Sequence, residues 1–225
     1  SNHYYMQWIQ EKLQDSQLIF GIPYYSGEKP ERNYYNSAVL IQADSIRSIY
    51  HKIQLVPGPE YIPLYDYFPL LQKLNLGQSN LTRGTDFTIM DVNDVKCAVM
   101  ICFESTFPAL SRKFVYNGAE VLIFLVNDGW YEKPPEPQQH AKQAIYRAIE
   151  NRRPVIRCTN TGISMFIDIG GNISQQIPLN TKGMMKTTIK PQNISTFYSR
   201  HGDIFAELNV LVSLLFITGV FIRKK

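Results

Sequence analysis

The stretch VMICFESTFP, residues 99–108, decides the fold of this chain because it joins a buried apolar run to a helix through a short polar turn. An apolar run without alternation favours a strand that is buried on both faces, as in a sheet covered by helices. Cys102 stands at the last position of that strand. A cysteine in this place is either an inert core thiol or a nucleophile held at a strand end, and taken alone the stretch favours the core thiol.

Strand–helix–strand units extend outward from this stretch. Residues 87–102 predict two strands joined at Asn93-Asp94, and the segments that follow alternate between helix and buried strand. Predicted helices cover 4–15, 107–119 and 136–153, and further predicted strands cover 18–25, 34–43, 46–52, 121–128, 154–160, 162–169, 173–179 and 184–191. This order predicts an α/β domain with helices on the outside of a sheet.

Composition limits the classes of function. The chain has 225 residues, of which 44% are hydrophobic, and a formal net charge of +4. Its Lys and Arg residues are scattered rather than gathered in a basic stripe, so the sequence predicts no nucleic-acid partner. Cys97, Cys102 and Cys158 make no disulfide framework, and no cysteine or histidine spacing suggests zinc.

Polar residues follow three predicted strands. Lys52 and Glu60 lie in YHKIQLVPGPEYIPL (50–64), Cys102 ends the opening strand, and Trp130 lies in FLVNDGWY (124–131). Each has an ordinary reading by itself: a solvated lysine, a core thiol and a capped turn. Together they favour a site, because open α/β sheets collect their active sites beyond the carboxyl ends of strands. A lysine beside a cysteine at adjacent strand ends would activate a thiolate.

The C-terminus is apolar from Leu208 to Ile222 and closes on Arg223, Lys224 and Lys225. Extended back to Ile204, the segment is long enough to cross a bilayer, and its basic end fits a cytoplasmic flank. A buried C-terminal helix of a soluble core is the alternative. We expect the membrane span, because only Ser213 and Thr218 interrupt the apolar run 210–222.

Four blocks carry a family resemblance: YHKIQLVPGPEYIPL, MICFESTFP, LVNDGWY and RAIENRRPVIRCTNTGIS. In order and spacing they resemble the nitrilase superfamily, and most closely its membrane branch, the apolipoprotein N-acyltransferase family. The resemblance implies an α/β, nitrilase-like α-β-β-α sandwich with a C-terminal transmembrane helix. Residues 1–203 would form the catalytic domain, and 204–225 the transmembrane helix with its basic cytoplasmic end.

The resemblance also implies a Glu–Lys–Cys triad. By motif position Lys52 resembles the triad lysine and Cys102 the nucleophile, while Glu60 and Glu104 match supporting acidic positions. The triad glutamate of the family lies upstream of the lysine, and no residue here matches it. We therefore expect these residues to be the N-terminally incomplete, C-terminal part of a longer enzyme, and to be inactive alone.

Three aromatic residues are expected to line the lipid side of the site. Phe103 stands where the family commonly has tyrosine, and Trp130 would line the acyl entrance. Tyr61 lies in the apolar, proline-rich loop 56–70, which we interpret as a lid that admits acyl chains. An ordinary loop packed on the core is the alternative.

The implied reaction moves an acyl chain from a phospholipid donor, through a Cys102 thioester, to the N-terminal cysteine amine of a diacylglyceryl apolipoprotein. The resemblance places the catalytic domain on the periplasmic face of a bacterial inner membrane, and it implies no metal or organic cofactor. Two alternatives remain open. One is an amidase of the nitrilase type that hydrolyses carbon–nitrogen bonds, and the other is a non-catalytic, membrane-tethered module of this fold.

Overall fold

The computed structural model describes residues 11, 13, 16–29, 32–42, 45–63, 80–130 and 135–223, with side chains up to residue 219. The predicted helix 4–15 lies outside these residues except for two positions. The described elements, in chain order, are β1 (Gln17–Ser26), β2 (Asn33–Gln42), β3 (Ser45–His51), β4 (Ile89–Val92), β5 (Val95–Ile101), η2 (Cys102–Thr106), α2 (Pro108–Tyr116), β6 (Val121–Val126), α3 (Glu136–Asn151), β7 (Val155–Thr159), β8 (Ser164–Ile167), β9 (Ile173–Ile177), α4 (Phe197–His201) and α5 (Ile204–Arg223).

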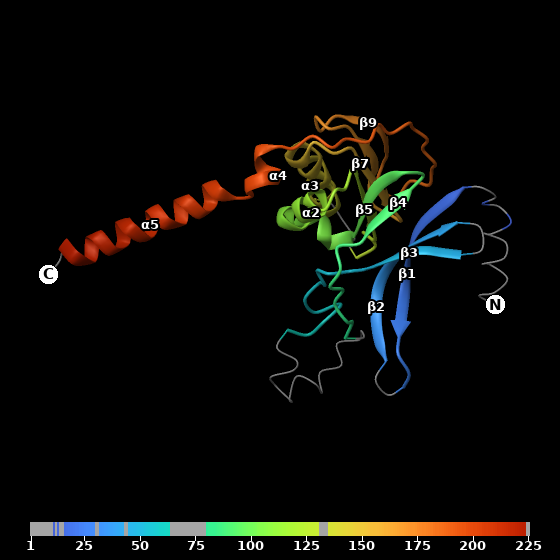
Figure 1. The fold of residues 1–225 in the computed structure, drawn as a ribbon, viewed down its shortest axis with the longest axis horizontal. Coiled ribbons are helices and arrows are strands. Elements are labelled where there is room, and N and C mark those ends of the chain that lie inside the picture. Colours follow the sequence, from blue (N-terminus) through green and yellow to red (C-terminus); the bar gives the residue numbers. More distant parts are fainter. Residues whose placement is uncertain are drawn as a thin grey trace.

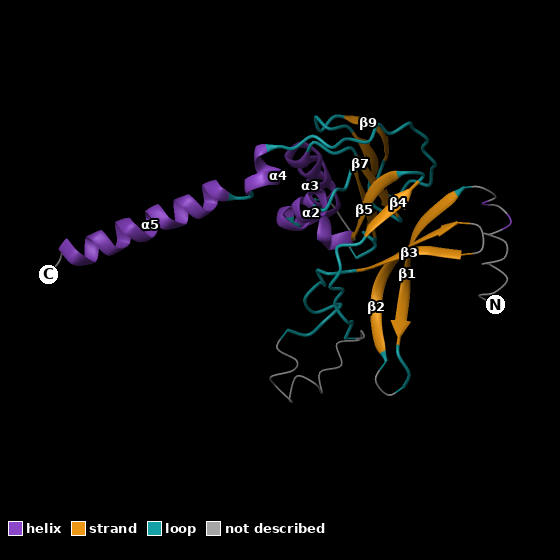
Figure 2. Cartoon of the chain, viewed as in Figure 1, coloured by secondary structure: helices purple, strands orange, loops and turns teal. Residues whose placement is uncertain are grey.

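The strands form two sheets (Figures 1 and 2). One is the antiparallel sheet β1-β2-β3, and the other has the order β4-β5-β6-β7-β8-β9. In the second sheet the central strands β5, β6 and β7 run parallel, because α2 and α3 carry the chain back between them. The outer strands of this sheet pair antiparallel.

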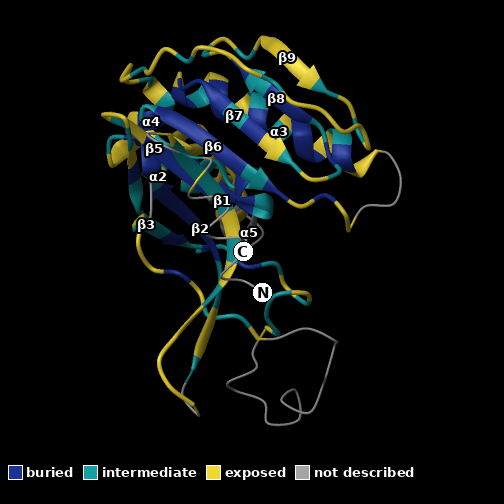
Figure 3. Ribbon diagram, turned by 90° about the vertical axis from the view of Figure 1, so that its right-hand side faces the viewer, coloured by how far each residue is buried: buried dark blue, intermediate teal, exposed yellow. Residues whose placement is uncertain are grey.

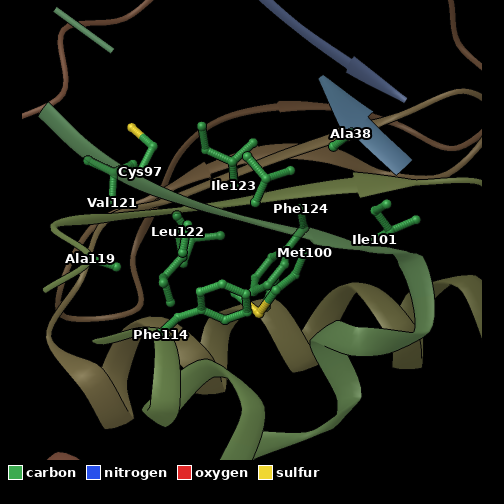
Figure 4. Close-up of a cluster of buried hydrophobic side chains, with 14 of the residues drawn as sticks. Ala38, Cys97, Met100, Ile101, Phe114, Ala119, Val121, Leu122, Ile123 and Phe124 are labelled. Carbon is green, nitrogen blue, oxygen red and sulfur yellow. The ribbon is translucent and has the colours of Figure 1, made fainter. Parts of the chain in front are cut away.

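The layers meet on the two faces of the larger sheet. Phe114, Met100 and Phe124 gather between that sheet and its helices (Figure 4). Ala38, on β2, lies on the opposite face, where β2 packs against β5. The described residues thus supply a helix layer and two sheet layers of the predicted sandwich.

The core lies in β5 and β6, which Figure 3 shows as the most buried strands. Ala98, Val99, Met100, Leu122 and Phe124 are fully buried. Burial on both faces explains why these strands read as unbroken apolar runs, whereas β9, at the sheet edge, is exposed along most of its length.

The predicted turn at Asn93-Asp94 is confirmed, and a second tight turn lies at Gly171. Asn93 and Asp94 join β4 to β5 with φ values of 50° and 66°, the left-handed backbone that a tight hairpin requires. Gly171, with φ of 87°, lies in the connection from β8 to β9. A turn of this kind needs positive φ, which is why short polar residues and glycine mark it in the sequence.

The predicted strand 184–191 is wrong, because the structure has no strand there. This segment runs past the edge strand β9, where the Gln175 side-chain amide donates to the Lys186 carbonyl at 2.9 Å. The segment forms no ladder of backbone hydrogen bonds with a neighbouring strand. Without such a ladder, a strand-like sequence pattern does not produce a strand.

Helix α5 extends away from the rest of the chain (Figure 1). Its large apolar side chains between Ile204 and Ile217 are 40–73% exposed. Among the residues whose side chains are described, no helix combines the length and apolar character needed to cross a bilayer. The membrane span over 204–225 therefore stays a prediction.

A paired substitution on α2 tests the core. Phe114 is fully buried with its ring against Phe87 and Tyr50, whereas Tyr116 is 80% exposed. Phe114→Ala should lower the free energy of unfolding by about 3–5 kcal/mol, since it leaves a cavity that the sheet cannot fill. Tyr116→Ala should change it by less than about 0.5 kcal/mol. Urea denaturation measures both values, and equal losses would contradict this placement of the core.

Candidate active site

Cys102 is the first residue of the short 3-10 helix η2, directly after β5, and its backbone makes a strained turn. Its φ is 53°, in the left-handed region that a residue with a side chain enters at a cost of roughly 1–2 kcal/mol. Such strain persists only where the surrounding contacts impose it, and it is concentrated at functional sites. The turn places the thiol beyond the carboxyl end of β5, as the sequence predicted for a nucleophile.

The thiol of Cys102 is half-buried, and its sulfur lies 3.6 Å from the carbonyl oxygen of Asn127, to which it donates. Burial raises the pKa of this thiol above its usual value. The ammonium of Lys52 and backbone hydrogen bonds at Asn127 and Phe103 oppose that shift, while the carboxylate of Asp128 adds to it. Since the pKa stays raised, attack by this sulfur requires a base that removes the proton.

Lys52 follows β3 directly and is 1% exposed. Its ammonium nitrogen lies 2.8 and 2.7 Å from the two carboxylate oxygens of Glu60. Glu60 also accepts from the Asn36 side-chain amide at 2.9 Å and from the Val56 backbone N–H at 2.7 Å. A buried ammonium with a fixed partner is a positive charge held in place for a developing oxyanion.

Glu104 is fully buried and accepts four hydrogen bonds. The Tyr50 hydroxyl and the backbone N–H groups of Ile53 and Gln54 donate to one oxygen at 2.7–2.9 Å. The Ile101 N–H donates to the other oxygen at 2.7 Å. Burial raises the pKa of Glu104 despite these bonds, and burial together with the Glu104 charge raises the pKa of Tyr50.

These hydrogen bonds show how Glu104 could play the supporting role predicted for it. Its carboxylate joins the segment just after Lys52 to the residue just before Cys102.

The sequence suggested that Lys52 and Cys102 lie at adjacent strand ends, and this was wrong in one respect. Lys52 follows β3 of the smaller sheet and Cys102 follows β5 of the larger one, so the site forms between two sheets. The packing of β2 on β5 brings these ends together.

The three predicted lining residues have different surroundings. Trp130 is 61% exposed in the turn after β6. The Phe103 ring packs edge-on against Phe107, with centroids 5.0 Å apart. The Arg83 guanidinium lies 4.4 Å above the Tyr61 ring, so this part of the predicted lid is held by a cation–π contact. The rest of that loop, 64–70, lies outside the described residues.

A buried polar network beneath Cys102 was missed in the sequence. The Asp128 carboxylate lies 2.7 Å from Nδ1 of His140 and 2.9 Å from Nη2 of Arg157. Burial opposes the charge on Asp128, but the hydrogen bonds and positive charges of these two partners hold its pKa below its usual range. Asp128 lies in the NDGWY block, from which only Trp130 was proposed for the site, and nothing in the helical pattern of 136–153 showed that His140 faces it.

Metal binding has no support in the described part of the chain, where no three His, Cys, Asp or Glu side chains gather to hold an ion. Cys97, Cys102 and Cys158 are free thiols. The arrangement around Cys102 can perform covalent chemistry by thiolate attack, with a fixed cation for the oxyanion.

Asp128→Asn tests the buried network. The variant leaves the Arg157 charge without its partner, so it should lower the free energy of unfolding at pH 7 by about 3–5 kcal/mol. The pKa of Asp128 is lowered by folding. The stabilisation is therefore complete above the pKa of an unfolded aspartate, near 3.9, and is lost as the pH falls through the folded-state pKa.

Urea denaturation from pH 7 to pH 3 measures this difference, which should be constant down to about pH 5 and shrink below about pH 4. Asp86→Asn, at an exposed carboxylate, is the control and should change the unfolding free energy by less than about 0.5 kcal/mol. A difference that grows on acidification would contradict the ionised state assigned to Asp128.

Comparison with known sequences gives the same answer as the blocks around the site. The sequence profile of the carbon-nitrogen hydrolase family matches residues 2–198. The chain is 32% identical over 92% of its length to an apolipoprotein N-acyltransferase of Geobacter metallireducens, and 33% identical over 98% of its length to that of Thermotoga maritima. It spans only 40% and 42% of these two relatives.

Solved structures agree on the fold. A carbon-nitrogen hydrolase from Helicobacter pylori superposes on 80% of this chain with a TM-score of 0.60 and 19% identity, and the match covers 65% of that protein. Nit3 of Saccharomyces cerevisiae, a member of branch 10 of the nitrilase superfamily, superposes on 80% with a TM-score of 0.58 and 18% identity, and the match covers 62% of it. With a profile match over most of its length and a nitrilase-like α/β fold around Cys102, the chain belongs to the carbon-nitrogen hydrolase family, the nitrilase superfamily.

Proposed function

We propose that this chain carries the acyl-transfer site of an apolipoprotein N-acyltransferase. One observation supports this function most directly. The thiol of Cys102, at a strained turn, lies within the electrostatic influence of the Lys52 ammonium, which is buried and paired with Glu60. The similarity to curated apolipoprotein N-acyltransferases supports the choice of acyl transfer over hydrolysis. The donor would be a phospholipid ester, and the acceptor the N-terminal cysteine amine of a diacylglyceryl apolipoprotein.

In the first half-reaction, the Cys102 sulfur attacks the ester carbonyl carbon of the phospholipid. The bond to the alcohol oxygen breaks, a thioester forms, and the lysophospholipid leaves with the proton that the thiol gave up. In the second half-reaction, the acceptor amine attacks the thioester, an amide forms and the thiol is regenerated. Lys52 and the Phe103 N–H would stabilise the oxyanion in both steps.

The described carboxylates nearest the site are already engaged. Glu60 accepts from Lys52, Asn36 and Val56, Glu104 accepts four bonds, and Asp128 is paired. The proposed base is therefore the triad glutamate of the family, to which no residue here is assigned. We expect residues 1–225 alone to show no turnover for this reason.

The proposed location is a bacterial cytoplasmic membrane, with the catalytic residues on its outer face. Both proposed substrates are anchored in lipid, so a site at the membrane surface would meet them without their crossing water. The exposed apolar side chains of α5 support a lipid environment for that helix, because such a surface in water is costly.

Trapping of the acyl-enzyme tests the reaction. The whole protein, in membranes, is incubated with a phospholipid that carries a labelled acyl chain, and hydroxylamine-sensitive label on the Cys102 peptide is measured by mass spectrometry. Label should form on the parent protein and be lost in Cys102→Ala. Glu60→Gln should slow labelling by about 100-fold or more, because the partner that fixes Lys52 is weakened. Label on another residue, or none on Cys102, would rule out the nucleophile.

The acceptor distinguishes the rival hydrolase. After labelling, a diacylglyceryl peptide with a free N-terminal cysteine amine is added. We expect the label to move to the peptide amine faster than it appears as free fatty acid. Release to water alone would identify a hydrolase, whereas a protein that acquires no label in the first step would be a non-catalytic module.

Removal of residues 204–225 tests the membrane assignment. The parent chain should partition into the detergent-rich phase of a Triton X-114 separation, and residues 1–203 should remain in the aqueous phase. The physical reason is the loss of the exposed apolar surface of α5. Substituting only Arg223, Lys224 and Lys225 by glutamine keeps that surface and serves as the control. Equal partitioning of the parent and the shortened chain would contradict the assignment.

A further inference from the structure

The buried network beneath the nucleophile reaches the backbone of Cys102 itself. The Cys102 carbonyl oxygen accepts a hydrogen bond from the Ser105 hydroxyl at 3.0 Å and lies 3.2 Å from Nε2 of His140. Ser105 and His140 are also 3.0 Å apart. These contacts bear on the one residue of the site whose backbone is strained, with φ of 53°.

The other ring nitrogen of His140 joins this carbonyl to a buried ion pair. Nδ1 lies 2.7 Å from an Asp128 oxygen, and the second Asp128 oxygen lies 2.9 Å from the Arg157 guanidinium. An ionised carboxylate only accepts hydrogen bonds, so Nδ1 carries the proton. Nε2 then contacts both Ser105 and the Cys102 carbonyl, and the single hydroxyl proton of Ser105 is donated either to that carbonyl or to Nε2.

Burial makes this connection rigid. Ser105 is fully buried, Asp128 and Arg157 are 1% exposed, and His140 is 6% exposed. The four residues come from different elements: η2, the turn after β6, α3 and β7. A Cβ on Gly162 would collide with the Asp128 carboxylate, so this close approach requires glycine. Because these groups are buried, water does not readily replace a hydrogen-bond partner that is lost. The position of each side chain therefore depends on the side chain to which it is bonded.

We propose that His140 is a positioning residue of the active site. The buried Arg157–Asp128 pair holds His140 in place, and His140 in turn holds the Cys102 carbonyl, so that the thiol stays beside Lys52. The inference rests on Cys102 being the nucleophile of the proposed acyl transfer. The hydrogen-bond contacts described for His140 are with Asp128, Ser105 and the Cys102 carbonyl. His140 keeps the left-handed turn from relaxing into an ordinary strand end, where the sulfur would leave the field of the lysine.

Two alkylating reagents measure where the thiolate lies. Iodoacetate is anionic and iodoacetamide neutral, and both react with the same thiolate, so the ratio of their rate constants cancels the fraction ionised. The ratio reports the charges around the sulfur, chiefly the ammonium of Lys52, which is paired with Glu60, and the carboxylate of Asp128, which is paired with Arg157. All variants are made in a Cys158→Ser background, because Cys158 is exposed and would react as well. Burial raises the pKa of Cys97 to about 12, so this thiol stays unreactive.

Two substitutions of His140 separate the contact made by Nδ1 from the contacts made by Nε2. His140→Asn keeps an amide near the Nδ1 position, for Asp128, and loses the Nε2 contacts. His140→Gln reaches the Nε2 position. Ser105→Ala removes one neutral hydroxyl and adds no charge. Ser111→Ala is the matched control, because Ser111 is also fully buried but donates to the Met100 sulfur on α2's side of the sheet.

We expect the ratio of iodoacetate to iodoacetamide rates to fall about three- to fivefold in His140→Asn and in Ser105→Ala, as for loss of one contact between unit charges in water. His140→Gln should return it at least halfway, and Ser111→Ala should not change it. If His140→Asn does not fold, Ser105→Ala decides. An unchanged ratio in Ser105→Ala, or Gln behaving as Asn, overturns the proposal. No lipid or lipoprotein is involved, so this result is independent of the acyl-transfer tests.

Discussion

The arrangement of the site depends on one buried carboxylate, that of Glu104. It accepts hydrogen bonds from Ile53 and Gln54 on one side and from Ile101 on the other, with Tyr50 as a further donor. These residues border Lys52 and Cys102. An unpaired carboxylate at this depth would be very costly, and four donors compensate that cost only if both chain segments stay in place. The same contact therefore stabilises the fold and holds the two chemical groups together.

Two acids near the nucleophile have different tasks because their surroundings differ. Burial raises the pKa of Glu104, although the donors around it favour the charged form. Asp128 has two cationic or hydrogen-donating partners, His140 and Arg157, which overcome burial and lower its pKa. Each oxygen of both carboxylates already accepts from a donor of the protein. This is why the proposed mechanism needs a further base, and why both residues are better understood as supports.

Much of the fold could be predicted because its signals are local. Unbroken apolar runs gave β5 and β6, and Asn93-Asp94 gave the hairpin between β4 and β5. The strand predicted over 184–191 failed for a non-local reason, since a strand needs a ladder of backbone hydrogen bonds to a neighbouring strand and this segment forms none. In the candidate site, block resemblance singled out Lys52, Glu60, Cys102 and Glu104, whose roles stay predictions, but it did not single out Tyr50, Ser105, His140 and Arg157.

The sequence by itself determined most of the succession of elements up to β9, and the family, because periodicity, turn chemistry and block order can all be read along the chain. Only the tertiary structure decided that Lys52 and Cys102 approach from different sheets, and that His140 faces the Cys102 carbonyl and Asp128 rather than solvent. Those facts depend on how β2 packs on β5 and how α3 packs on the larger sheet. Side chains far apart in sequence meet there through burial, and no local pattern records which of them will meet.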